Sequence, residues 1–148
     1  MLAGKHAISF GPLVCMLFFG LSLALADEVQ AIEDANEHYQ QGWDALNQRN
    51  WLEAANHFEL SYKAKPRPDV AYLLSVAYSK LGKFVQASKF ATEALSGQPP
   101  LTEPFVGDAR NIIAWAQRAS RVEKESEGKA DTVLPPPPNV GLPPRLRP

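Results

Sequence analysis

The sequence contains a single cysteine, Cys15, which lies inside the first apolar run of the chain. If that run is removed after export, the remaining chain has no thiol. It then cannot form a disulfide, use a thiol nucleophile or bind a metal through cysteine. The histidines His6, His38 and His57 are equally sparse and lack the paired spacing of metal ligands. We therefore predict neither a metal site nor a cofactor.

The chain also lacks an excess of charge of either sign, with 15 Lys and Arg against 16 Asp and Glu. Nucleic-acid-binding domains usually carry a basic patch or a high pI, so we exclude nucleic acid as a partner. No nucleophile elbow, phosphate-binding glycine loop or zinc signature occurs. We therefore expect a protein that is not an enzyme. A length of 148 residues fits one domain.

The first 26 residues are typical of a secretory signal. Lys5 provides a positive start, Leu13 to Leu25 form an apolar run, and small residues precede a cleavage site after Ala26. The prediction is a cleavable signal peptide over 1–26 and a periplasmic or secreted protein. The alternative is an uncleaved membrane anchor, which Gly11-Pro12 disfavours because it shortens the apolar run.

The C-terminal segment has a different composition from the rest of the chain. Seven of the 13 prolines fall between Pro135 and Pro148. Such a segment favours extended polyproline geometry and cannot build a core. We expect 126–148 to be a disordered proline-rich tail that acts as a spacer. Arg145 and Arg147 beside prolines leave open the alternative of a docking peptide.

The intervening sequence repeats itself after 33 residues. The shift aligns Tyr39 with Tyr72, Trp51 with Phe84, Ala54 with Ala87 and Pro66 with Pro99. A period of this length predicts a helix pair per repeat, over about 35–67 and 68–100.

Apolar periodicity predicts five helices in a domain spanning 27–125. The expected bounds are 29–47, 51–64, 69–81, 84–96 and 103–123. The third helix is apolar almost all round, which places it in the middle of the array. The fifth is amphipathic, with Asp108 and Arg110 on its charged face, and would cap the array.

Several positions resemble the tetratricopeptide repeat family. Gly42 and Ser75 provide small residues midway along the first helix of each pair, where two helices cross closely. Trp51 precedes Ala54 by three residues, and Phe84 precedes Ala87 likewise, whereas Ala45 departs from the expected aromatic. The resemblance implies an all-α fold, a TPR-like α-solenoid of two helix hairpins plus a C-terminal capping helix. A generic helical bundle is the alternative.

The resemblance also implies a concave groove lined by the first helix of each pair and by the capping helix. Val106 and Ile113 would contribute from the capping helix, and Trp43 and Val76 replace the asparagines of a chaperone-tail clamp. The expected partner-binding residues are Tyr39, Trp43, Leu46, Asn47, Tyr72, Val76, Ser79, Lys80 and Arg110. Alternatively, Tyr39, Tyr72 and Val76 only pack between helices.

A groove of this kind predicts an exported protein–protein interaction module, a scaffold or adaptor of the bacterial periplasm or cell envelope. Its partner would be a peptide or helix segment of another protein. Two alternatives stay open. One is a self-assembling structural envelope protein, since two and a half repeats bury little surface and a homodimer would add more. The other is an auxiliary subunit of a cell-envelope machine. The membrane would be contacted only through an uncleaved signal segment.

Overall fold

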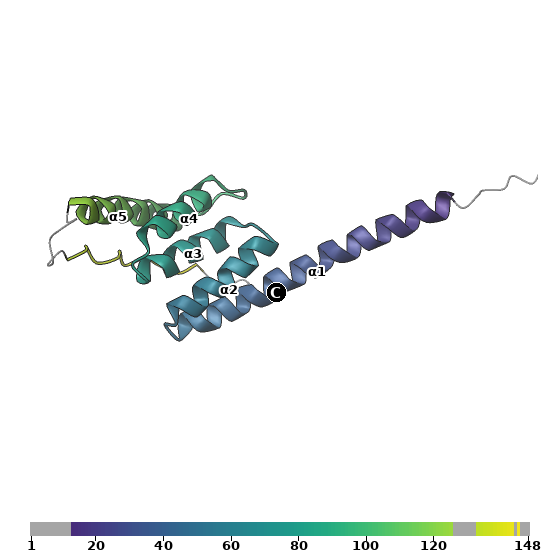
Figure 1. The fold of residues 1–148 in the computed structure, drawn as a ribbon, viewed down its shortest axis with the longest axis horizontal. Coiled ribbons are helices and arrows are strands. Elements are labelled where there is room, and N and C mark those ends of the chain that lie inside the picture. The colour runs from purple at the N-terminus through teal and green to yellow at the C-terminus, as the bar shows by residue number, and fades with distance from the viewer. Residues whose placement is uncertain (1–12, 126–132, 144, 146–148) are drawn as a thin grey trace, which may run out of the picture.

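The computed structural model describes the backbone of residues 13–125, 133–143 and 145, and side chains from Glu28 onward. Within those ranges the protein is all-helical, with no strand, which confirms the predicted all-α class. The helices are α1 (Leu13–Asn47), α2 (Trp51–Ala64), α3 (Pro68–Lys80), α4 (Phe84–Ser96) and α5 (Phe105–Glu125). Figure 1 shows α2 to α5 packed together beside the C-terminal half of α1.

The bounds of α2 and α4 are those that the sequence predicts, and α3 and α5 differ from prediction by one or two residues. Helix α1 differs more, because it begins at Leu13 and runs without interruption through the predicted cleavage site. Its N-terminal half extends away from the other helices (Figure 1). Residues 1–12 of the predicted signal lie outside the described residues. No helix in the described part of the chain is both long and apolar enough to cross a membrane.

Helix α3 occupies the centre of the array, as its sequence predicts. It packs against α2, α4 and α5, whereas α1 packs mainly on α2. Every residue of α3 from Val70 to Ser79 is buried. A helix without a polar face gains stability when neighbouring elements bury it, and α2, α4 and α5 supply much of that cover.

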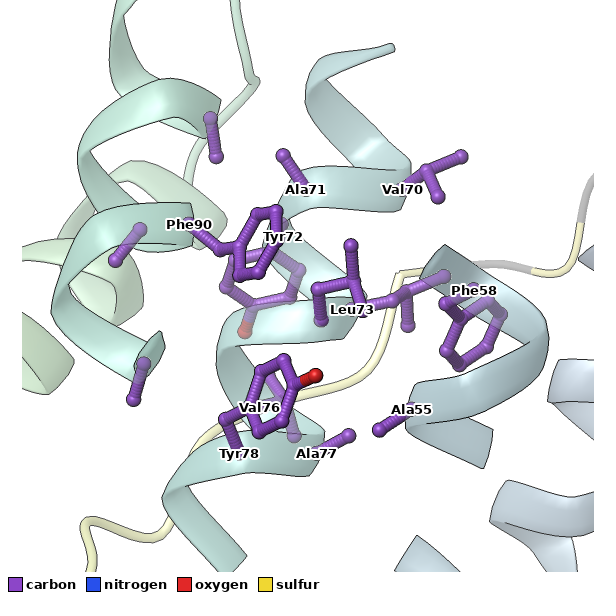
Figure 2. Close-up of a cluster of buried hydrophobic side chains, with 14 of the residues drawn as sticks. Ala55, Phe58, Val70, Ala71, Tyr72, Leu73, Val76, Ala77, Tyr78 and Phe90 are labelled. Atoms are coloured by element: carbon purple, nitrogen blue, oxygen red, sulfur yellow. The ribbon is translucent and has the colours of Figure 1, made fainter. Parts of the chain in front are cut away.

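Aromatic side chains join α3 to its neighbours on both sides (Figure 2). Tyr78 of α3 stacks on Phe90 of α4 with ring centroids 5.8 Å apart. Phe90 also forms a T-shaped ring pair with Tyr62 of α2, with centroids 5.8 Å apart. Such pairs stabilise beyond the apolar area that they bury. The Tyr78 hydroxyl donates to Glu59, and burial, followed by this hydrogen bond, raises the pKa of Tyr78.

The turns after α1 and α3 have the same structure, 33 residues apart. Arg49 and Gly82 both adopt a left-handed conformation, with φ of 59° and 70°. The next backbone N–H reaches back across the last helical turn in each case, from Asn50 to Ala45 and from Lys83 to Tyr78, both at 2.9 Å. This is the Schellman type of helix ending, in which the left-handed residue is usually glycine. The sequence repeat is therefore also a structural repeat at these turns.

The crossing of α1 and α2 depends on the absence of a side chain at Gly42. A Cβ atom at this position would lie 2.6 Å from Cε1 of Phe58 and 2.7 Å from its Cδ1. Phe58 is fully buried, so its ring has no room to move aside. The structure thus gives the steric reason for the small residue that the sequence analysis singled out.

We predict that Gly42→Ala lowers the free energy of unfolding by about 1–3 kcal/mol, because the methyl group overpacks the contact with Phe58. Gly107→Ala is the matched control, since its Cβ would meet only Glu103 Oε2 at 3.7 Å. That change should raise stability by up to about 1 kcal/mol through helix propensity. Urea denaturation measures both. Equal effects of the two substitutions would contradict the close crossing at Gly42.

We predict that glycine is the more stable residue at both of the equivalent turns, so that adding it at one and removing it from the other have opposite effects on stability. Arg49→Gly should stabilise the protein by about 1 kcal/mol, because glycine adopts positive φ without strain. Gly82→Ala should destabilise by a similar amount through backbone strain alone, since no atom lies within 4 Å of the added Cβ. Thermal unfolding of the two variants tests this, and a lower melting temperature for Arg49→Gly would contradict it.

Candidate functional site

The tail folds back across the helices and contacts three of them in turn. Residues 133–143 and Arg145 have no regular secondary structure. Their trace runs from the end of α5 past α3 toward α1 (Figure 1). We call the side chains that hydrogen-bond it the tail-binding face. These are Gln40 and Asp44 of α1, Tyr72 and Lys80 of α3, and Asp108 and Trp115 of α5.

Carbonyl groups of the tail accept hydrogen bonds from three of these side chains. Trp115 Nε1 donates to the carbonyl of Pro135 at 2.9 Å. Lys80 Nζ donates to the carbonyl of Pro138 at 3.3 Å. Proline has no N–H and an extended chain has no internal hydrogen bonds, so these carbonyls are free for side-chain donors.

The third donor is Tyr72, which belongs to a three-residue centre with Asp108 and Gly141. The Tyr72 hydroxyl lies 2.6 Å from the Gly141 carbonyl and 3.3 Å from Asp108 Oδ2. It has one proton, so the shorter contact is its donor bond. The Gly141 N–H donates to Asp108 Oδ2 at 2.9 Å. Both backbone groups of Gly141 are therefore bound, without recognition of a side chain.

Burial, and after it the charge of Asp108, raises the pKa of the Tyr72 hydroxyl well above its usual value. A tyrosine hydroxyl is protonated at neutral pH in any case, and the raised pKa keeps it a donor in more alkaline solution as well.

Arg145 anchors the far end of the described tail on α1. Its Nη1 lies 2.9 Å from Asp44 Oδ1, and its guanidinium also donates to the side chain and the backbone carbonyl of Gln40. The side chains of the ion pair are 40% and 59% exposed. An ion pair this exposed contributes little stability and weakens with salt, but it favours a positive charge at the end of the tail.

Apolar side chains of the tail also lie against the helices, and space remains beside them. Val140 packs against the core, and Pro143 is buried. Pro143 borders a pocket of about 290 Å³ next to Phe105. Val140 and Leu142 border another of about 410 Å³ beside Val76. Side chains larger than those of the tail would find room in both.

The predicted partner-binding residues divide into three groups. Tyr72 and Lys80 hydrogen-bond the tail, and Val76 lines a pocket with it. Asn47 and Arg110 are exposed. The others are buried, namely Tyr39, Trp43, Leu46 and Ser79. Within this last group, Tyr39 packs on the rings of Trp43 and Phe58, and the Ser79 hydroxyl donates to the Val76 carbonyl.

Four members of the tail-binding face were not among the predicted site residues: Gln40, Asp44, Asp108 and Trp115. The apolar stripe of the fifth helix predicts that Asp108 lies on the opposite, charged face, whereas in the structure its carboxylate faces Tyr72. Trp115 did carry a usable signal. A buried indole N–H usually needs an acceptor, and a proline-rich segment offers unpaired carbonyls.

The tail itself differs from the predicted spacer. Residues 126–132, 144 and 146–148 lie outside the described residues, but those between Pro135 and Gly141 contact α5 and α3. The physical reason is that polyproline geometry satisfies no backbone group internally, so polar side chains on a nearby surface can bind it.

His38 and His57, the histidines whose side chains the structure describes, lie together. His38 Nδ1 is 3.4 Å from His57 Nδ1, and His38 also contacts Gln41. In the residues for which the structure gives side chains, no three His, Cys, Asp or Glu groups are positioned to hold a metal ion.

Substitution of Trp43 distinguishes a role in the core from a role on a partner-binding surface. Its side chain is 5% exposed, and its Nε1 has no hydrogen-bond partner among the described atoms. We predict that Trp43→Ala lowers the free energy of unfolding by about 3–5 kcal/mol. Trp43→Phe should change it by about 1 kcal/mol or less, because removal of an unpaired N–H offsets lost packing. A normal thermal melt of Trp43→Ala would contradict this placement.

Comparison of the chain with models of known families, with curated proteins and with solved structures gives no match. We therefore infer function from the contacts of this chain alone.

Proposed function

We propose that this chain is a protein–protein interaction module, without enzymatic activity, that binds an extended peptide segment of another protein on the tail-binding face. We further propose that its helices form a TPR-like α-solenoid of two hairpins and a capping helix. The repeated helix ending at Arg49 and Gly82 supports this arrangement, and so does the close crossing at Gly42.

The observation that carries the proposal is that a polypeptide segment already lies on this face. Trp115, Lys80 and Tyr72 come from two helices and each donates to a backbone carbonyl of the tail. Side chains arranged to bind the backbone of an extended segment recognise the geometry of that segment more than its side chains. This is the behaviour expected of an adaptor or scaffold.

The same contacts favour an extended peptide over a partner helix. Most backbone carbonyls of a helix accept hydrogen bonds within the helix and offer little to an outside donor. The tail-binding face is rich in donors to carbonyls, and Asp108 accepts a backbone N–H. An extended segment supplies both kinds of group.

We also propose export, with cleavage after Ala26. Within the described side chains the first buried residue is Ala35. A cut after Ala26 would leave all of the described core in place, with α1 shortened to its packed part. The mature chain would therefore keep the tail-binding face intact.

A photo-crosslinking experiment tests the interaction module in cells that make the protein. A photoreactive amino acid replaces Asn47, which is exposed and lies three residues after Asp44 on α1, hence on the same side of that helix. We expect it to crosslink to a partner protein. The matched control replaces Leu60, which is 46% exposed on α2, outside the tail-binding face. Equal crosslinking from both positions, or none from position 47, would contradict the proposal.

A further inference from the structure

We propose that the tail is an internal ligand of the tail-binding face, and that the partner segment is a proline-rich extended peptide ending in arginine that binds by displacing it. This inference rests on the proposed function, because it names the class of partner and how its access is controlled. Four features of the tail and its contacts specify that class.

The bound carbonyls of the tail are evenly spaced. They belong to Pro135, Pro138 and Gly141, which follow one another at intervals of three residues. A polyproline helix has three residues per turn and rises about 3.1 Å per residue, so every third carbonyl points the same way. Trp115, Lys80 and Tyr72 thus contact one side of such a helix over about 19 Å. The face is matched to polyproline geometry and not merely to any extended chain.

The face also needs a backbone N–H from the ligand residue that supplies the third carbonyl. Asp108 accepts from the Gly141 N–H, which proline cannot provide. A Cβ atom at position 141 would lie 3.4 Å from Asp108 Oδ2 and 4.0 Å from Phe105, which is ordinary contact. The ligand therefore requires a residue other than proline here, but not specifically glycine.

The C-terminal end of the described tail carries a positive charge. Arg145 follows Gly141 by four residues and meets Asp44 and Gln40. A carboxylate at this place favours arginine, whose planar fork can contact two groups at once, and it disfavours an acidic residue. The resulting ligand pattern is proline, proline and a non-proline residue at intervals of three, then arginine four residues later.

The tail of the same chain occupies the face, and a partner segment can replace it. Residues 126–132 join the tail to α5. A short linker gives an effective concentration of about millimolar, which exceeds that of a second copy at micromolar concentration. The tail nevertheless leaves pockets of about 290 and 410 Å³ beside it, and the ion pair between Arg145 and Asp44 is exposed. A partner segment with larger apolar side chains would fill that space and bind more tightly.

A competition experiment with the full chain tests the proposal. The probe is a fluorescent peptide with the sequence of residues 133–148, and its binding is followed by anisotropy. Gly141→Pro in the chain removes the N–H that Asp108 accepts and lies outside the helices, so the contacts among the helices are kept, and a thermal melt checks that the variant is folded. We expect this variant to bind the probe about tenfold or more tightly than the wild-type chain, because its own tail competes less. Gly141→Ala keeps the N–H and should behave like wild type.

Four results would overturn the proposal. Equal affinity of the wild-type and Gly141→Pro chains would mean that the tail does not occupy the face. A probe that itself carries Gly141→Pro and binds as well as the original would contradict the register. A dimer of the wild-type chain that Gly141→Pro dissociates would make a second copy the occupant. No binding of the probe to any variant would exclude this ligand class, while crosslinking from position 47 could still support an interaction module.

Discussion

The structure depends on one constraint, which is that α3 has no side that tolerates water. Every residue between Val70 and Ser79 is buried, and helices on either side cover most of that surface. Two hairpins and a final helix do not enclose it completely. The remaining strip, around Tyr72 and Val76, is where the tail lies. The path of the tail follows from what the helices leave uncovered.

Enclosure also determines how the polar groups of α3 are satisfied. The hydroxyls of Ser75 and Ser79 donate to carbonyls three residues earlier in their own helix, at 2.7 Å each. Tyr72 is too long for such a local bond, so its hydroxyl extends to the edge of the helix and meets Gly141. A buried hydroxyl without a partner would cost stability. The hydrogen bond that satisfies the Tyr72 hydroxyl is therefore also one of the bonds that hold the tail.

How much the sequence could predict follows from the range of each interaction. Helices α2 and α4, the small residue at Gly42 and the central place of α3 follow from periodicity and local sterics, both of which are visible in one sequence. The contact of Asp108 with the tail, and the tail residue that Trp115 binds, could not be predicted, because polyproline has no apolar pattern that fixes its register. The start of α1 at Leu13 does not follow from the sequence, because an apolar run of this composition is typical both of a signal peptide and of a helix that continues into the domain.

The same strip of α3 links stability to binding. If the tail covers apolar surface that the short array leaves open, then displacing it exposes that surface unless the incoming segment covers it in turn. A ligand that binds only the folded state stabilises it in proportion to the logarithm of its concentration. A segment with the proline spacing and arginine of the tail, and with bulkier groups for the two pockets, satisfies every polar group that the tail satisfies and buries more. On this proposal, the requirement to cover α3 contributes to recognition of the partner segment beside the polar contacts of Asp108 and Asp44.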